Sequence, residues 1–185
     1  MGKEKGNAYE RELCVIFSKW WSGGKSEDLF YRTHGSGGRA TSRARFGKQT
    51  PGSDGDLMCV DPDGQVFIDR FSIEAKNGYG MEWSVQDILE KTPRSAKRLF
   101  EEFWEQAVRS ATHANKEPLL VFKKNRRQDI LCVRTSVAGH LGLLPTETFP
   151  SLILRHEGER IMLLPLKAFL ENVSREQVEA ATWLT

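Results

Sequence analysis

The sequence predicts an α/β fold, because amphipathic helical segments and groups of short strand-like runs succeed one another along the chain. Apolar residues recur close to the 3.6-residue helical period in residues 8–21 and again in residues 95–116. Short apolar runs bounded by turn sequences follow each helical segment. We therefore expect the order helix, strands, helix, strands, completed by a small C-terminal β/α extension.

The size and composition of the chain indicate one domain. Its 185 residues, 39% of them hydrophobic, suffice for one buried core. No run approaches the roughly 18 consecutive apolar residues of a membrane span, and no signal-peptide core follows the charged N-terminus. We expect a single domain over residues 1–185, with a core at about 5–135 and the extension at about 136–185.

The cysteines favour a reducing compartment. Cys14, Cys59 and Cys132 are an odd set without C-x-x-C spacing, and each lies among apolar neighbours. We interpret them as reduced core residues, so a cytoplasmic location without any membrane association is expected.

Two strands are predicted in the middle of the first half of the chain. Residues 57–60 and 71–76 are strand-like runs, and Asp61-Pro62-Asp63-Gly64 between them is typical of a turn. We predict that the two runs pair as a hairpin, with a bulge or an excursion at residues 66–70.

The second half also contains paired runs. Residues 118–122 and 129–133 follow the helix predicted at 95–116 and read as a second hairpin. Residues 152–155 and 161–164 are two further strand-like runs. Ser174 with Gln177 forms a plausible capping box for a last helix.

Basic residues are gathered in two places, although the net charge of +2 by itself indicates no partner. No acidic residue occurs from His34 to Ser53, and a second basic cluster lies between the two strands of the hairpin predicted in the second half. Both clusters could bind nucleic-acid phosphates, while solvated loops are the alternative for each. Their members are Arg39, Arg43, Arg45 and Lys48 in the first, and Lys123, Lys124, Arg126 and Arg127 in the second.

Alternation along residues 71–76 separates a core face from a chemical face. Phe71, Ile73 and Ala75 would point one way, while Ser72, Glu74 and Lys76 would point the other. A carboxylate and an ammonium group two residues apart on a strand can hold a metal ion and orient a water beside it. A surface salt bridge is the ordinary alternative for this triplet taken alone.

Two more carboxylates bear on this constellation. Asp56 precedes the predicted strand at 57–60, and in a hairpin it would fall near Glu74. Glu10 lies roughly 60° from the centre of the apolar stripe of the first helix, whereas Glu12 lies at roughly 100°. Glu10 is therefore the better candidate to face a site. Two carboxylates, a main-chain carbonyl and waters would suit Mg²⁺.

These residues, in this order, resemble the motifs of archaeal-type Holliday junction resolvases of the restriction-endonuclease-like PD-(D/E)XK superfamily. The similar segments are Lys5-Gly6-x-x-x-Glu10-Arg11-Glu12-Leu13, Arg32 before Gly35-Ser36-Gly37, Gly55-Asp56-Leu57, and Ile73-Glu74-Ala75-Lys76. Farther on, Phe103-Trp104-Glu105-Gln106-Ala107 and the run from Pro118 to Arg127 are similar to phage-encoded PD-(D/E)XK endonucleases.

The resemblance implies a restriction-endonuclease-like core, with a mixed central sheet flanked by helices, and a homodimer that hydrolyses DNA phosphodiesters. It implies that Asp56, Glu74 and the main-chain carbonyl of Ala75 bind Mg²⁺, for which Mn²⁺ would substitute. Lys76 would position the attacking water, and Glu10 would act at or near the metal. Arg32 and Ser36 match positions near the scissile phosphate. A phage source would place the protein in the cytoplasm of a bacterial host.

Gln106 and His34 are candidates for accessory roles in such a site. Some nucleases of this superfamily carry a glutamine on the helix after the E-x-K strand, and Gln106 flanks the apolar stripe there. A polar residue without a role is the alternative for either. The histidines are scattered along the chain, which argues against an HNH or zinc nuclease. The aromatic pairs Trp20-Trp21 and Phe103-Trp104 are expected in the core or a dimer interface.

Three functions stay open at this point. The first is cleavage of branched DNA by a Holliday junction resolvase, in recombination, repair or phage DNA processing. The second is a sequence-specific or repair endonuclease, with residues 37–53 reading a groove. The third is a non-catalytic DNA-binding protein with a nuclease fold. A complete set of acids and lysine argues against the third, because clustered buried charges are costly without a neutralising partner.

Overall fold

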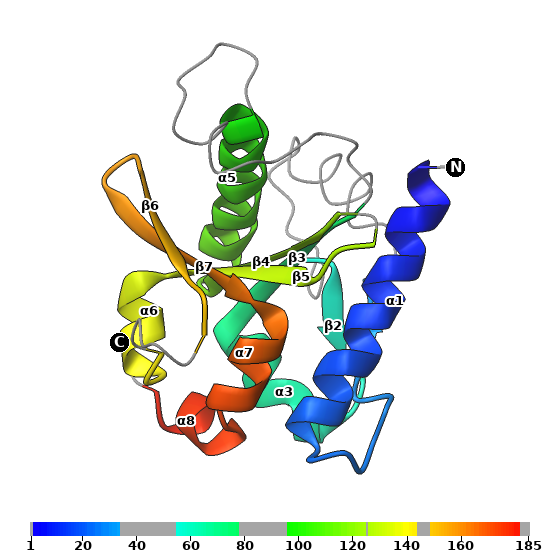
Figure 1. Cartoon of the computed structure of the whole chain (residues 1–185). Coiled ribbons are helices and arrows are strands. Elements are labelled where there is room, and N and C mark those ends of the chain that lie inside the picture. The colour runs from blue at the N-terminus through cyan, green and yellow to red at the C-terminus, as the bar shows by residue number, and fades with distance from the viewer. Residues whose placement is uncertain (1, 34–54, 78–95, 125, 144–148, 182–185) are drawn as a thin grey trace.

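The computed structural model describes residues 2–33, 55–77, 96–124, 126–143 and 149–181 (Figure 1). The helices in these residues are α1 (Gly2–Trp21), α3 (Gln65–Arg70), α5 (Ala96–Ala114), α6 (Thr135–His140), α7 (Leu166–Asn172) and α8 (Arg175–Ala180), with the 3-10 turn η1 (Pro62–Gly64). The strands are β1 (Phe30–Arg32), β2 (Leu57–Cys59), β3 (Phe71–Asn77), β4 (Glu117–Lys123), β5 (Asp129–Arg134), β6 (Leu152–His156) and β7 (Glu159–Pro165).

The centre of the fold is a five-stranded mixed sheet in the order β3-β4-β5-β7-β6. β3 and β4 are parallel, and α5 provides the crossover between them, whereas the other pairs are antiparallel. β1 and β2 form a separate two-stranded antiparallel sheet. This α/β architecture confirms the predicted fold class, and it is consistent with a restriction-endonuclease-like core.

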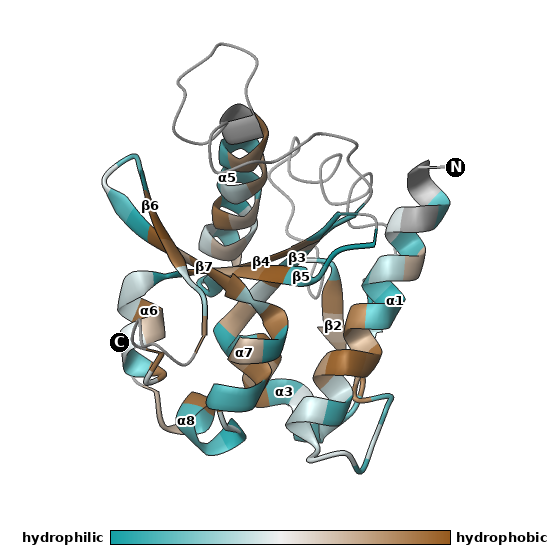
Figure 2. Cartoon of the chain, viewed as in Figure 1, coloured by the Kyte–Doolittle hydropathy of each residue, from teal (hydrophilic) through white to brown (hydrophobic). Residues whose placement is uncertain are grey.

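Each face of the five-stranded sheet has its own apolar layer. Side chains alternate along a strand, so Leu119 and Val121 of β4 enter the larger core with α1, α3 and α7, whereas Leu120 packs with α5. Figure 1 shows α5 on one side of the sheet and α1, α3 and α7 on the other. Figure 2 shows hydrophobic residues concentrated along the strands between these helices.

Phe67 of α3 anchors the larger core and ties α1 to the sheet. It is fully buried, and its ring centroid lies 5.3 Å from that of Phe17 and 5.4 Å from those of Trp21 and Phe71. Offset and edge contacts of this kind stabilise a core by about 0.5–1.5 kcal/mol per pair beyond the burial of area. The N-terminal helix is therefore fixed against the segment that leads directly into β3.

The predicted hairpin between residues 57–60 and 71–76 is wrong. β2 pairs with β1 instead, with Tyr31 opposite Met58, and η1 and α3 separate β2 from β3. The turn-like sequence starts a helix here: Asp61 caps η1 by accepting a hydrogen bond from the backbone N–H of Asp63, and Pro62 occupies its first turn. The excursion expected at residues 66–70 is α3.

Other predicted elements are confirmed. The helices at 8–21 and 95–116 correspond to α1 and α5, and the hairpin of the second half corresponds to β4 and β5. Ser174 and Gln177 form a capping box at the start of α8. The C-terminal strands β6 and β7 extend the main sheet through the pairing of β7 with β5. Helices α6 and α7 are too short for their sequences to show a helical period.

The predicted environment of the cysteines and aromatic pairs is also confirmed. All three cysteines are free thiols, with Cys14 and Cys132 buried and Cys59 partly buried. Trp21 and Trp104 are each less than 3% exposed, while Trp20 and Phe103 pack against the same cores. Within the described segments, none of the helices combines the length and apolar character that crossing a membrane requires.

Gly55 brings the chain unusually close to β3. Its φ is +88°, in the region that residues with a Cβ rarely adopt. A Cβ at this position would lie 2.7 Å from the carbonyl oxygen of Ile73 and 2.9 Å from its amide nitrogen. Both atoms are backbone, so the strand cannot yield without losing its own hydrogen bonds. Only glycine allows residue 56 to approach β3 in this way.

Gly55→Ala should therefore lower the free energy of unfolding by about 3 kcal/mol or more, because backbone strain and a steric clash add. Gly23→Ala is the matched control. Gly23 also has a positive φ, of +62°, but a Cβ there meets no atom within 4 Å. The control should cost only about 1 kcal/mol. Urea denaturation measures both variants, and equal losses would contradict a close approach at Gly55.

Candidate active site

Asp56 is fixed at the open edge of β3 by three main-chain interactions. Its amide donates to the carbonyl of Ile73 at 2.7 Å, and its own carbonyl accepts from the amide of Thr33 at 2.9 Å. Its Oδ2 accepts a hydrogen bond from the amide of Ala75 at 2.9 Å. The side chain therefore has one orientation, and the residue as a whole is only 7% exposed.

Glu74 points to the side of the sheet that α5 covers, and one of its oxygens accepts two hydrogen bonds. Its Oε1 accepts from the ammonium of Lys76 at 2.5 Å and from the side-chain amide of Gln106 on α5. The residue is 4% exposed. Lys76 is held in turn over the ring of Phe103, with its Nζ 5.6 Å from the centroid. This is the arrangement predicted from strand alternation, with Glu74 and Lys76 together on the chemical face.

Glu74 is close enough to Asp56 for its negative charge to affect the ionisation of Asp56. Burial and, after it, the negative charges of Glu74 and Glu10 raise the pKa of Asp56 to about 7. The amide of Ala75 and the charge of Lys76 lower the pKa in part. Among the described residues, three carboxylates, those of Asp56, Glu74 and Glu10, thus lie in a poorly solvated place with two nearby cations, Lys76 and Arg32.

Glu10 reaches this region from α1 through an ion pair with Arg32 of β1. The Nε of Arg32 lies 2.6 Å from Oε2 of Glu10, and its Nη2 donates to the side chain of Asn7 at 2.9 Å. Both members of the pair are mostly buried, with 14% and 21% of their side chains exposed. Sequence reasoning did not select Asn7, although its place one helical turn before Glu10 puts the two side chains on the same face.

The residues present fit a divalent cation. Asp56 and Glu74 supply carboxylate oxygens from two different segments, and their mutual repulsion is the electrostatic condition that a bound cation relieves. The carbonyl of Ala75 lies on the same edge as Asp56, because the N–H and C=O of a strand residue point to one side. This supports the main-chain ligand predicted at Ala75, which stays a prediction.

Two buried hydroxyl groups adjoin Asp56. Ser72 and Thr33 are 1% and 4% exposed, and neither side-chain oxygen has a hydrogen-bond partner among the described residues. Ser72 is two residues before Glu74, and its Oγ would lie 3.0 Å from a Cβ on Gly55. Alternation had placed Ser72 on the chemical face, but no sequence signal gave it a role.

The second cluster of basic residues, 123–127, lies at the turn between β4 and β5. Lys123 is engaged within the protein, because its Nζ lies 2.8 Å from a carboxylate oxygen of Glu12 and 3.7 Å from one of Asp129. Arg126 and Arg127 are exposed and Lys124 is partly exposed. The remaining predicted site residues lie outside the described part of the chain: His34, Ser36, Arg39, Arg43, Arg45 and Lys48.

Comparison with models of known protein families gives a match that covers most of the chain. The family model described as "Phage putative PDDEXK endonuclease" matches residues 1–179. The chain belongs to this family. Its members are nucleases of a superfamily that typically uses divalent metal ions, and the match includes the C-terminal residues beyond 135 that carried no resemblance by sequence reasoning. No curated protein and no solved structure gives a match.

The raised pKa of Asp56 predicts a particular pH dependence of stability in this member of the phage PDDEXK family. Between an unfolded pKa near 3.8 and a folded pKa of about 7, the folded protein binds more protons than the unfolded chain. Stability contributed by Asp56 is therefore present at low pH and is lost as the pH rises through this window. Asp56→Asn removes that loss and retains an oxygen for the Ala75 amide.

In buffer with a metal chelator, we expect Asp56→Asn to be more stable than the wild type at pH 8, by a few kcal/mol and at most about 4. The difference should shrink towards pH 4, where Asp56 is protonated in the folded wild-type protein. Thermal or urea unfolding across this pH range measures the effect. Wild-type and variant curves that run parallel over the whole range would show that Asp56 is not strained by its charged neighbours.

Proposed function

We propose that this protein is an Mg²⁺-dependent endodeoxyribonuclease that cuts branched DNA, acting as a Holliday junction resolvase in recombination, repair or phage DNA processing. The supporting observation is the joint burial of Asp56 and Glu74 beside the ammonium of Lys76. Membership of a phage endonuclease family supports DNA as the substrate. The free, buried thiols of Cys14 and Cys132 agree with work in the reducing cytoplasm of a bacterial host.

Asp56 and Glu74 would hold the Mg²⁺ ion together with the carbonyl of Ala75, and Glu10 would add negative charge at the edge. When bound, such an ion neutralises charge that builds on the phosphodiester and lowers the pKa of a bound water. The rigid attachment of Asp56 to β3 keeps its carboxylate in place before substrate arrives, so little reorganisation is needed on binding.

Lys76 would orient the attacking water through its ammonium group. Its Nζ lies over the ring of Phe103 and 2.5 Å from Oε1 of Glu74, so the charge is held beside the carboxylate pair. Gln106 is a positioning residue, because it donates to the same oxygen of Glu74 and thereby limits rotation of that carboxylate.

The basic groups at the turn between β4 and β5 would bind the DNA backbone. Lys124, Arg126 and Arg127 make no ion pair with any residue in the described ranges, so their charges can neutralise phosphates. Lys123 would contribute less, since Glu12 and Asp129 already compensate it. Arg32 would act mainly by holding Glu10, and the basic residues between 36 and 48 would supply further phosphate contacts.

Branched DNA is the proposed substrate because the acidic set occurs with Arg32 in the order found in archaeal-type junction resolvases. Two copies related by a twofold axis would set two sites against the symmetric strands of a four-way junction. The competing functions are a sequence-specific or repair endonuclease and a non-catalytic DNA-binding protein. Each predicts a different outcome in the experiments below.

Lys76→Met should lower the cleavage rate at least about a hundredfold, because methionine retains an unbranched side chain and lacks the ammonium group. Lys167→Met is the matched control: Lys167 is 81% exposed and pairs only with Glu171 among the described residues. The control should cut DNA like the wild type. Single-turnover cleavage of plasmid DNA with Mg²⁺ measures both rates. Equal rates for both variants would remove Lys76 from the chemistry.

Asp56→Asn should abolish cutting while four-way junctions are still bound, because the basic surface is left intact. Binding by the variant and cleavage by the wild type are compared on a four-way junction and on linear duplex of the same sequence. We expect cuts at the branch point and preferential binding to the junction. Intact junctions together with cut duplex would refute junction resolution, and a fixed cut sequence would favour the site-specific alternative. An inactive wild type that binds DNA would favour the non-catalytic one.

A further inference from the structure

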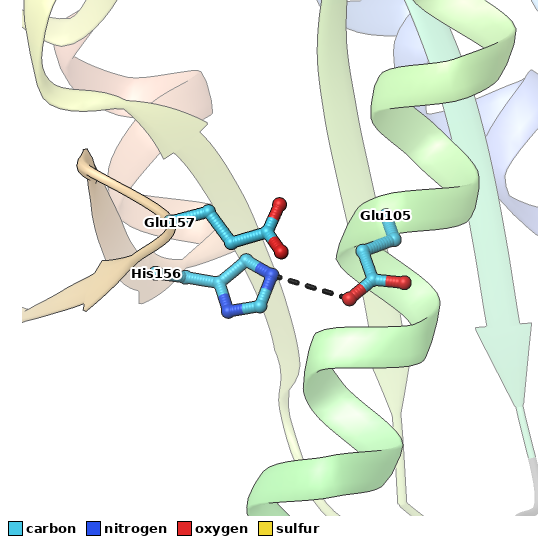
Figure 3. Close-up of side chains that lie close together, drawn as sticks. All are labelled: Glu105, His156 and Glu157. Atoms are coloured by element: carbon cyan, nitrogen blue, oxygen red, sulfur yellow. Dashed lines mark ion pairs between the residues drawn. The ribbon is translucent and has the colours of Figure 1, made fainter.

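We propose that Glu105, His156 and Glu157 form a second cation site, for a divalent transition metal such as Zn²⁺, that joins the β6–β7 hairpin to α5. Each of these residues can offer one ligand atom, and the three atoms lie within 4.8 Å of one another. Figure 3 shows Glu105 on α5 facing the imidazole of His156, with the carboxylate of Glu157 directed to the same place. This proposal does not rest on the proposed nuclease function.

The main observation for this site is the environment of the His156 imidazole. Its Nε2 is shielded from solvent and has no hydrogen-bond partner among the described residues. Oε1 of Glu105 lies 3.3 Å away, within ion-pair range but not in hydrogen-bond geometry. A buried nitrogen without a hydrogen bond costs free energy, and a metal ion would satisfy it while also binding both carboxylates.

The surroundings of His156 suit a ligand. Its other nitrogen, Nδ1, lies 3.6 Å from a carboxylate oxygen of Glu101, one helical turn before Glu105. Metal-binding histidines usually present their second nitrogen to a carboxylate, which fixes the tautomer and orients the ring. A cavity of about 320 Å³ adjoins the three residues and is also lined by Trp104, Arg109 and Glu159, which leaves room for bound water.

The donor set favours a transition metal over Mg²⁺. One imidazole nitrogen with two carboxylates suits zinc and its neighbours, whereas Mg²⁺ prefers oxygen ligands in a strict octahedron. Zinc binds such ligands at about 2.0–2.2 Å in a tetrahedron, so ligand atoms must come to roughly 3.5 Å from one another. Glu157 is exposed and can make this small adjustment, while His156 is held by its neighbours.

This site and the carboxylate site lie on opposite edges of the sheet. β3, which carries Glu74, is one edge strand, and β6, which carries His156, is the other. α5 connects them through adjacent residues that point about 100° apart: Gln106 donates to Glu74, and Glu105 faces His156. A cation at the second site would therefore fix the helix that positions Glu74.

The turn of the hairpin provides a sharp test variant. Glu157 and Gly158 both have positive φ, of 47° and 85°, between the paired residues His156 and Glu159. Such a two-residue turn favours Asn-Gly, so Glu157→Asn should retain or improve the turn while it removes the carboxylate. His140→Ala is the matched control for histidine, since His140 is exposed on α6 and its Nδ1 lies 2.8 Å from the carbonyl oxygen of Ser136 in the same helix.

The experiment uses full-length Asp56→Asn/Glu74→Gln protein, so that metal binding at the proposed nuclease site is suppressed. Zn²⁺ titration by calorimetry should give one bound ion per chain. At a hundredfold excess of Zn²⁺ over its Kd, the unfolding midpoint should rise by about 5–10 °C. Mg²⁺ at the same concentration should give neither effect.

Added to this background, His156→Ala and Glu157→Asn should each weaken Zn²⁺ binding at least about tenfold, and His140→Ala should leave it unchanged. Absence of zinc binding in the background protein would overturn the proposal. Binding that survives both ligand variants would overturn it as well, because the ion would then lie elsewhere. Neither outcome bears on DNA cleavage, so the proposed nuclease function is tested separately.

Discussion

The hydrogen bond from the Ala75 amide to the Asp56 carboxylate is the constraint on which the site depends. Asp56 belongs to the segment before β2, whose partner strand is β1, so no regular ladder fixes it to the main sheet. Two bonds do so instead, at Ile73 and Ala75, and the approach is open only because Gly55 lacks a side chain. The two-stranded sheet therefore positions the carboxylate of Asp56 at the edge of the five-stranded sheet, where Glu74 of β3 lies beside it.

The burial of the Asp56 carboxylate beside other carboxylates lowers the stability of the fold. Burial and two neighbouring carboxylates raise the pKa of Asp56 to about 7, so the ionised form is held at a cost. The rest of the fold tolerates this because Phe67 and its aromatic neighbours fix α1 and α3 on the opposite face of β3. A strained, charged edge supported by a rigid apolar layer is a usual arrangement for a site that binds cations, since stability is recovered when the cation binds.

Local patterns in the sequence predicted what local physics determines. Alternation placed Glu74 and Lys76 together, and the capping box of Ser174 and Gln177 marked the start of α8. The prediction of a hairpin was wrong because Asp-Pro-Asp-Gly is compatible both with a turn and with the start of a helix. The helix forms here because Phe67 packs in the core against residues far away in the sequence, such as Phe30. Arg32 pairs with Glu10 and Lys123 with Glu12, both from α1, and no period in the sequence encodes these long-range contacts.

Helix α5 has a greater role than its apolar stripe suggests. Phe100, Trp104 and Ala107 bury one side, which fixes the rotation of the helix about its axis. With that rotation set, Gln106 must face β3 and Glu105 must face the β6–β7 hairpin, because successive residues differ by about 100°. The C-terminal strands thus contact the same helix that limits Glu74, and the family match extends over them to residue 179. Any ligand that tightens the hairpin on α5 would therefore also restrict the carboxylate at the far edge of the sheet.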